Sequence, residues 1–181
     1  MMEVVELSLP EVKLVKPRRF NDTRGFFQQT YHCDLYAAAG IATRFVQDNW
    51  SRSCKGVLRG MHYQLKNPQA KLVAVVRGEI FDVAVDSRRG SSTFGRWTSA
   101  FLSDENGHQM FIPEGFAHGF LVLSDEADVI YKCSDFYAPG DEYGFVWSDP
   151  DVGVDWPGGI DPLVSEKDAV LPSLSNATVF A

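Results

Sequence analysis

The chain has 181 residues, 45% of them hydrophobic, which is enough for one domain with a buried core. The formal net charge is −7, but residues 1–123 hold fifteen Lys/Arg and twelve Asp/Glu, whereas residues 124–168 hold two and twelve. An acidic chain without a basic tail argues against a nucleic acid as partner, while a pocket for a small anion remains open because local charge governs a pocket.

Most of the chain has the pattern of short strands separated by turn residues. The predicted strands, in chain order, are residues 26–31, 45–50, 56–64, 71–76, 79–86, 96–102, 110–112, 117–123, 129–134 and 143–147. A short helix is expected at 34–39, before Gly40, and a helical turn is expected after Ser165 as its N-cap. About ten antiparallel strands with one or two short helices predict a mainly β fold, a cupin or jelly-roll barrel.

The segment from Gly107 to His118 carries the most informative motif. Its glycine, proline, glycine and histidine stand at positions 107, 113, 115 and 118, the spacing of the second cupin motif. Pro113 and Gly115 predict a turn between two strands, after which His118 would point into the barrel. A second histidine on a predicted strand, His62, lies upstream, so the two histidines indicate where the chemistry takes place.

The residues around these histidines do not suit a metal-binding cupin. Such a site needs three or four ligands, commonly a His-x-His pair with a Glu and a further His. Here Gln64 replaces the second His of the pair, and no carboxylate follows at the expected distance. We therefore expect no catalytic metal, which leaves His62 and His118 free to act as acid, base or hydrogen-bond partner.

Three cysteines, Cys33, Cys54 and Cys133, are widely spaced, and no C-x-x-C motif is present. This usage predicts reduced thiols in a cytoplasmic protein. The N-terminus lacks the features of a signal peptide, and no run of about 18 apolar residues predicts a membrane span. Without a linker or an internal repeat, we expect a single domain over residues 1–181.

Seven segments carry a resemblance that covers the chain from about Leu7 to Asp168. They are residues 45–49, 57–64, 71–73, 78–86, 112–120, 131–137 and 165–168. In this order they resemble the dTDP-4-dehydrorhamnose 3,5-epimerases. The resemblance implies a cofactor-free, homodimeric cupin isomerase that inverts C3 and C5 of dTDP-4-dehydro-6-deoxy-D-glucose. The product, dTDP-4-dehydro-L-rhamnose, belongs to dTDP-L-rhamnose synthesis for cell-surface carbohydrate such as lipopolysaccharide.

This chemistry requires a base and an acid on opposite faces of the sugar. Both carbons flank the C4 ketone, so removal of either proton gives an enolate with its charge on O4. The resemblance implies that His62 is the base with Asp168 as its partner, and that Tyr131 is the proton donor. Lys71 would stabilise the charge on O4. Only the resemblance pairs His62 with Asp168, since 106 positions separate them.

The resemblance also implies substrate contacts. Arg24 and Arg59 match contacts to the diphosphate, because guanidinium forks fit phosphate oxygens. Tyr137 matches the aromatic that stacks on thymine, and His118 matches a donor to the sugar or phosphate. The other predicted contacts are Gln29, Gln47, Asp48, Asn49, Lys71, Glu142 and Lys167.

Two positions depart from the family pattern: Gln29 replaces a Glu, and Trp50 replaces a His. They bear on which sugar and nucleotide bind more than on the reaction type. The alternatives are a relative that epimerises only C3 or C5, a 3,4-ketoisomerase of the same barrel, and a sugar-nucleotide-binding cupin without catalysis. A metal-dependent dioxygenase is disfavoured by Gln64.

Overall fold

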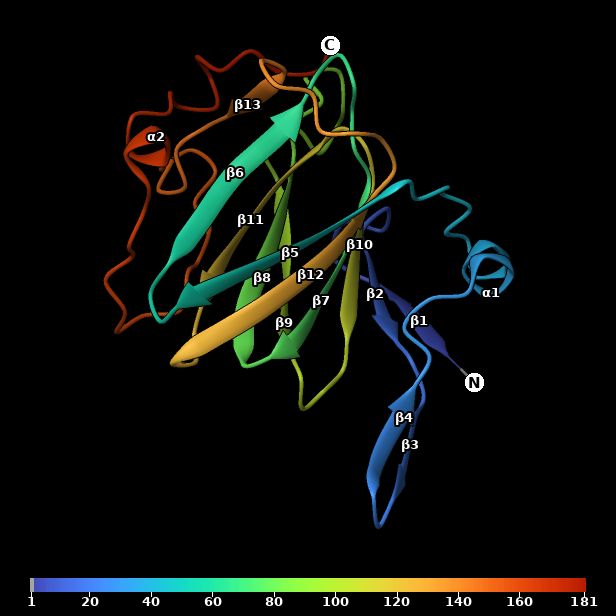
Figure 1. Cartoon of the computed structure of the whole chain (residues 1–181). Helices are drawn as coiled ribbons and strands as arrows, with labels where there is room; N and C mark the ends of the chain where they lie inside the picture. Colours follow the sequence, from blue (N-terminus) through green and yellow to red (C-terminus); the bar gives the residue numbers. More distant parts are fainter. Residues whose placement is uncertain (1) are drawn as a thin grey trace.

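Two antiparallel sheets packed face to face form the body of the computed structural model, which describes residues 2–181 (Figure 1). In spatial order, the first sheet contains β1 (Glu3–Glu6), β2 (Lys13–Lys16), β10 (Gln109–Ile112), β7 (Lys71–Arg77), β12 (Glu126–Cys133) and β5 (Gln47–Cys54). The second contains β13 (Glu142–Gly144), β6 (Leu58–Gln64), β11 (Phe116–Val122), β8 (Glu79–Asp86) and β9 (Trp97–Ser103).

The prediction of a mainly β, jelly-roll-like fold is confirmed, although the strands form two open sheets and not a closed barrel. The predicted helix is α1 (Cys33–Ala38), and the predicted C-terminal turn is α2 (Glu166–Ala169). As expected, Ser165 caps α2, since its Oγ accepts the Asp168 N–H at 3.1 Å. The sequence pattern missed the three short strands β1, β2 and β3.

An apolar layer packs against each face of the second sheet. The layer between the sheets includes Val73, Val129 and Phe120. The other layer lies on the far face of the second sheet, where the alternating apolar residues of β8 pack under the C-terminal segment, including Phe145 and Leu174. Burial of this apolar area is the main stabilising term of such a fold. It also leaves the opposite face of β8, with Asp82, turned toward the interior.

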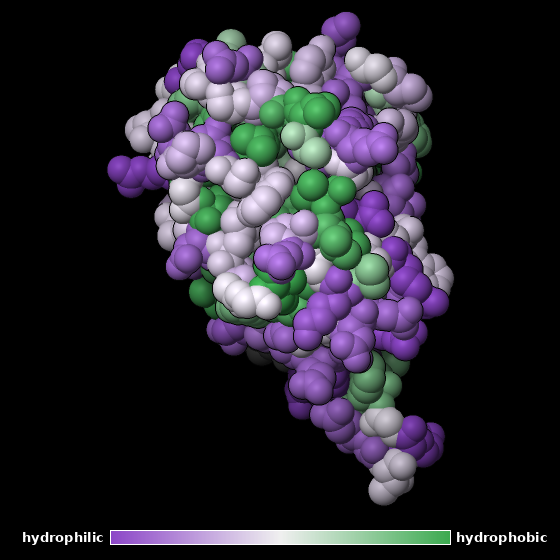
Figure 2. Space-filling model, turned by 90° about the vertical axis from the view of Figure 1, so that its left-hand side faces the viewer, coloured by the Kyte–Doolittle hydropathy of each residue, from purple (hydrophilic) through white to green (hydrophobic). Residues whose placement is uncertain are grey.

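A hairpin arm, β3 (Arg19–Asp22) with β4 (Gly25–Gln28), projects from the body next to β1 and β2 (Figure 1). The rings of Phe26 and Phe27 are 59% and 68% exposed. Figure 2 shows the arm as a narrow projection below the body, and apolar groups in green on the side that bears α2. None of the helices within residues 2–181 is long and apolar enough to cross a membrane.

Candidate active site

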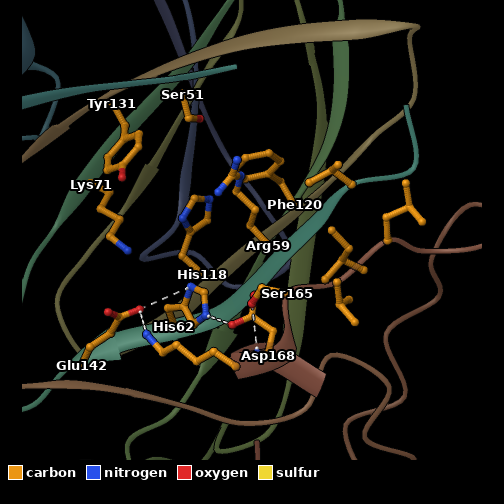
Figure 3. Close-up of a pocket in the computed structure, with 15 residues that line it drawn as sticks. Ser51, Arg59, His62, Lys71, His118, Phe120, Tyr131, Glu142, Ser165 and Asp168 are labelled. Carbon is orange, nitrogen blue, oxygen red and sulfur yellow. Dashed lines mark hydrogen bonds and ion pairs between the residues drawn. The ribbon is translucent and has the colours of Figure 1, made fainter. Parts of the chain in front are cut away.

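A cavity of about 530 Å³ lies between the sheets, and both sheets and the α2 segment contribute to its wall (Figure 3). The first sheet supplies three of its side chains and the second sheet supplies the two predicted histidines. The polar residues that line it are Ser51, Arg59, His62, Lys71, His118, Tyr131, Glu142, Ser165, Lys167 and Asp168. Six other predicted site residues therefore share one cavity with His62 and Asp168, the predicted catalytic pair that sequence spacing alone could not connect.

His62 and Asp168 form a hydrogen-bonded pair, with His62 Nε2 2.7 Å from Asp168 Oδ1. Asp168 is buried, and its other oxygen accepts the Gly60 N–H at 3.5 Å. Burial raises the pKa of Asp168, but the hydrogen bonds from His62, Gly60 and Ser165 outweigh it and hold the pKa below its usual value. Because a carboxylate only accepts, Nε2 carries the proton in the neutral tautomer of His62, and Nδ1 then holds the lone pair.

His118 lies opposite His62 on β11 and has its own carboxylate, since its Nε2 lies 2.7 Å from Asp82 Oδ1. Both residues of this second pair are buried. Burial lowers the pKa of His118, with Lys71 and His62 adding to the effect while Asp82 opposes it. The neutral ring therefore carries its proton on Nε2 and accepts at Nδ1, whereas the predicted role as a donor would require the imidazolium.

Lys71 and Tyr131 reach the cavity from the first sheet. Lys71 pairs with Cys133 across β7 and β12, and Tyr131 stands two residues away on the same face of β12. Burial lowers the pKa of Lys71, although Cys133, Asp82 and Glu142 pull it back upward. Burial raises the pKa of Tyr131, so its phenol keeps its proton at neutral pH and remains a donor.

Glu142 lines the cavity and contacts three other residues of the site, Lys167, His62 and Tyr137. Its Oε1 lies 2.6 Å from Lys167 Nζ and 4.0 Å from His62 Nδ1, and its Oε2 accepts the Tyr137 hydroxyl at 3.2 Å. Burial raises the pKa of Glu142, but the contacts with Lys167, His62 and Tyr137 lower it overall. A carboxylate with three polar neighbours holds the mouth of the cavity in one arrangement.

A smaller hollow of about 140 Å³ adjoins the main cavity and shares His62, Lys71, Tyr131 and Glu142 with it. Its polar wall includes the predicted residues Gln47, Asn49 and Tyr137. Asn49 pairs with Tyr131 across β5 and β12, so the two side chains lie on the same face of the sheet. Eleven predicted residues therefore line one continuous polar region: Gln47, Asn49, Arg59, His62, Lys71, His118, Tyr131, Tyr137, Glu142, Lys167 and Asp168.

Asp48, a predicted substrate contact, lies outside the cavity of its own chain, on the outer face of the first sheet. Successive residues of a strand point to opposite faces, so Asp48 faces away from the cavity that its neighbours Gln47 and Asn49 line. Its carboxylate accepts from Lys132 Nζ at 2.9 Å on that outer face. Trp50 lies on the same outer face and is 69% exposed, so it does not reshape the cavity of its own chain.

Arg24 and Gln29 do not reach the cavity of their own chain either. Arg24 sits at the tip of the arm, where its guanidinium pairs with Asp22 at 2.6 Å and its side chain is 88% exposed. Gln29 follows β4 and is also exposed. Both belong to the projecting arm and not to the wall of the cavity.

Several residues that line or support the site were not among the predicted site residues. Asp82 pairs with His118, Ser51 and Phe120 line the cavity, and Gln64 binds the loop that carries Tyr137. The buried Ser51 Oγ and Asp82 Oδ2 find no hydrogen-bond partner within residues 2–181. The alternation along 79–86 carried a signal for Asp82, because a carboxylate inside a strand with apolar neighbours needs a partner.

Comparison with known proteins identifies the family. The sequence profile of dTDP-4-dehydrorhamnose 3,5-epimerase matches residues 6–176. A dTDP-4-dehydrorhamnose 3,5-epimerase of Neisseria gonorrhoeae is 55% identical over 168 residues, 92% of this chain, and the chain spans about half (51%) of that relative's length.

Two solved structures are similar over most of their length. RmlC from Legionella pneumophila Philadelphia 1, a dTDP-6-deoxy-D-glucose-3,5-epimerase in complex with dTDP-4-keto-L-rhamnose, has a TM-score of 0.95 and 48% identity, covering 97% of this chain and 94% of that chain. ChmJ, a 3′-monoepimerase from Streptomyces bikiniensis in complex with dTDP-quinovose, has a TM-score of 0.88 and 35% identity, covering 93% and 86%. The chain therefore belongs to the dTDP-4-dehydrorhamnose 3,5-epimerase family of isomerases.

Proposed function

We propose that this chain inverts C3 and C5 of dTDP-4-dehydro-6-deoxy-D-glucose, giving dTDP-4-dehydro-L-rhamnose for dTDP-L-rhamnose synthesis. The observation that carries the proposal is the position of the two proton-transfer groups on different sheets. His62 lies on β6 of the second sheet and Tyr131 on β12 of the first, and both line one cavity. A sugar ring held between them would lose a proton on one face and regain one on the other, which is an inversion.

His62 is suited to remove the proton. Asp168 accepts from Nε2, so the lone pair on Nδ1 is available, and the carboxylate would stabilise the imidazolium that forms. The resulting enolate carries its charge on O4. We assign Lys71 to that oxygen, because it is the ammonium that reaches the cavity from the wall shared with Tyr131, and a preorganised cation stabilises developing charge.

Tyr131 is suited to return the proton, because burial keeps its phenol protonated. The remaining polar residues would bind the nucleotide. We assign Arg59, which is exposed at the cavity, and Lys167 to the diphosphate. The adjoining hollow with Gln47, Asn49 and Tyr137 would hold the deoxythymidine portion, with Tyr137 stacking on the base.

We also propose that the protein works as a homodimer in which the arm of one copy reaches the cavity of the other. This would bring the partner copy's equivalents of Arg24 and Gln29 to the substrate, although both lie away from the cavity of their own chain. The outer face of the first sheet supports an interface, since it has a hollow of about 350 Å³ and an exposed Trp50. The three cysteines are free thiols, which fits the cytoplasm as the compartment.

The decisive experiment is proton NMR of dTDP-4-dehydro-6-deoxy-D-glucose with the enzyme in D2O, without added metal or cofactor. Deuterium at both C3 and C5 supports the 3,5-epimerase. Deuterium at one carbon only supports the single-centre alternative, which the similarity to the 3′-monoepimerase ChmJ keeps open. Absence of exchange at both carbons would contradict the proposed reaction and favour a binding role.

A further inference from the structure

Gln64 occupies the position where a metal-binding cupin has its second histidine, but here its amide forms hydrogen bonds with backbone atoms. The side chain is buried, with 4% of its surface exposed. Its Nε2 donates to Asn67 O at 2.7 Å and to Phe136 O at 3.2 Å, and its Oε1 accepts the Ala138 N–H at 2.9 Å. Both amide hydrogens and the amide oxygen are therefore used, and two of the three bonds go to one loop.

Two further glutamines hold the same loop, residues 135–138. Gln47 Oε1 accepts the Tyr137 N–H at 2.9 Å, and Gln69 Nε2 donates to Asp135 O at 2.8 Å. Gln47 begins β5, Gln64 ends β6 and Gln69 lies in the loop after β6, and all three line the hollow next to the main cavity. We call these three side chains the glutamine cradle. It gives each of four consecutive loop residues a fixed backbone hydrogen bond.

The cradle presents an exposed aromatic ring. Tyr137 is 53% exposed although its backbone N–H is bound by Gln47 and its hydroxyl is bound by Glu142 at 3.2 Å. An exposed aromatic residue whose backbone and hydroxyl are both hydrogen-bonded loses little conformational entropy when a planar group stacks on its ring. Phe136, next to it, is 63% exposed, so the loop turns its apolar surface outward while its polar backbone is bound.

We propose that Gln64 is a positioning residue for nucleotide binding, and that the glutamine cradle holds residues 135–138 so that Tyr137 is ready to stack on the base of the substrate. This inference rests on the proposed function, because it takes the base of a dTDP-sugar as the planar group. Gln64 touches no substrate in this role, and it acts through the backbone on either side of Tyr137. The hydrogen bond between His62 and Asp168 does not involve Gln64.

The test is Gln64→Leu, which nearly keeps the volume of the side chain and removes all three hydrogen bonds. We expect the Kd for dTDP, measured by calorimetry, and the KM for the dTDP-sugar to rise about tenfold or more, as the loss of one to two hydrogen-bonded constraints implies. The kcat should change by less than about threefold, because binding and not the chemical step is affected. Leu102→Val is the matched control, since Leu102 is fully buried in β9 away from the cavity and its change lowers stability alone.

Gln64→Glu provides a second variant if Gln64→Leu folds poorly. A buried glutamate has a raised pKa, so its ionised form faces the carbonyl oxygens of Phe136 and Asn67 at high pH, whereas its acid form donates to one of them at low pH. We therefore expect the affinity of Gln64→Glu for dTDP, relative to wild type, to improve as the pH is lowered from about 8 to about 5.5. A purely structural role for Gln64 would not link affinity to pH in this way.

Three outcomes would overturn the inference: a Kd for dTDP in Gln64→Leu within about twofold of wild type, an equal loss of affinity in Leu102→Val, or a wild-type protein that does not bind dTDP. Failure of the proposed reaction looks different. In that case wild type binds dTDP, and Gln64→Leu weakens the binding, but no deuterium enters C3 or C5. The positioning role of Gln64 would then stand while the assignment of the reaction would not.

Discussion

His62 and His118 stand directly opposite each other on β6 and β11, and each uses Nε2 to bind a buried carboxylate. They differ in their surroundings. The His62 side chain is 25% exposed and has Glu142 within 4.0 Å, whereas the His118 side chain is 8% exposed and burial lowers its pKa. His62 is therefore placed to exchange a proton with substrate, and His118 is placed to make a fixed polar contact as a neutral ring.

Replacement of His62 by alanine should abolish the reaction while leaving the fold intact. We expect the rate of deuterium exchange at C3 and C5 to fall by at least 10²-fold, about the smallest loss expected when a general base is removed. Circular dichroism and thermal unfolding should match wild type within a few degrees. His32→Ala, an exposed histidine outside the cavity, is the control, and a His62→Ala enzyme with near-normal exchange would show that another group is the base.

Replacement of Asp168 by asparagine should leave the site assembled but weaken the base. The amide cannot stabilise the imidazolium as the carboxylate does, so we expect kcat to fall on the order of 10²- to 10⁴-fold with a smaller change in KM. Steady-state kinetics with a coupled reductase measure both constants. An unchanged kcat would mean that the charge of Asp168 plays no part in proton transfer.

The same variant predicts how stability depends on pH. The pKa of Asp168 is lowered in the folded protein, so its ionised form stabilises the fold at pH values above its ordinary pKa of 3.8. That contribution is lost as the pH falls below 3.8 through the folded-state pKa. Urea unfolding should therefore show a gap between wild type and Asp168→Asn at pH 7 that narrows with acidification below pH 4. A gap that widens on acidification would contradict the sign of the shift.

Tyr131→Phe separates the two halves of the inversion. Without the phenol, His62 can still remove a proton and return one to the same face of the sugar. We therefore expect exchange of deuterium at the C–H bonds to persist while net inversion slows by about 10²-fold or more. NMR of the sugar in D2O measures exchange and inversion in one sample. Loss of exchange together with inversion would mean that Tyr131 also takes part in proton removal.

Replacement of Gly60, which lies next to the site, should lower the stability of the fold through its backbone. A Cβ at Gly60 would lie 2.5 Å from Gly119 Cα and 2.8 Å from His118 O, and the backbone has φ +128°. Gly140 also has positive φ, at +86°, but nothing within 4 Å of its Cβ position. We expect Gly140→Ala to lower the free energy of unfolding by about 1 kcal/mol and Gly60→Ala by at least about 3 kcal/mol, measured by urea titration. If both variants lost the same free energy of unfolding, β6 and β11 would be able to move apart at Gly60 without an energetic penalty.

Periodicity found most of the sheet strands, because alternation is a local property of strands such as β8. It did not show which face of β8 turns inward. Phe81, Val83 and Val85 pack under the C-terminal segment, while Asp82 faces the cavity, and this choice depends on a segment about 60 residues further along the chain. The motif likewise did not show that Asp48 lies outside the cavity, since a motif marks a stretch of residues whereas strand geometry sends alternate residues to opposite faces.

The residues of the site could be predicted from the sequence only where they belong to a recognisable motif. Asp168 could be linked to His62 through resemblance, because the contact depends on how the C-terminal segment returns over β6. Gln64 was recognised only as a missing metal ligand, since its hydrogen bonds go to backbone atoms whose positions no sequence pattern reveals. Arg24 matched a binding motif, yet the fold places it on the projecting arm. The sequence pattern did not show that this arm lies away from the cavity of its own chain.

The proposed dimer predicts that two impaired variants, Arg24→Ala and His62→Ala, restore activity when they are mixed. Arg24→Ala should weaken diphosphate binding at the partner's cavity, and His62→Ala should remove the base from its own cavity. In a hybrid dimer one of the two sites would combine an intact Arg24 from one copy with an intact His62 from the other. Random mixing gives hybrids in about half of the dimers, so about a quarter of the sites should be fully active, following from two-fold symmetry.

The experiment denatures and refolds a mixture of the two variants and measures epimerisation at substrate concentrations where Arg24→Ala alone is slow. Activity above the sum of the two separate preparations, approaching a quarter of wild type, supports the exchange of arms between copies. Arg44→Ala, an exposed arginine outside the arm, should give no such gain when mixed with His62→Ala beyond its own activity. If the mixture of Arg24→Ala and His62→Ala shows only additive activity, the arm of each copy does not complete the partner's cavity, and Arg24 acts elsewhere.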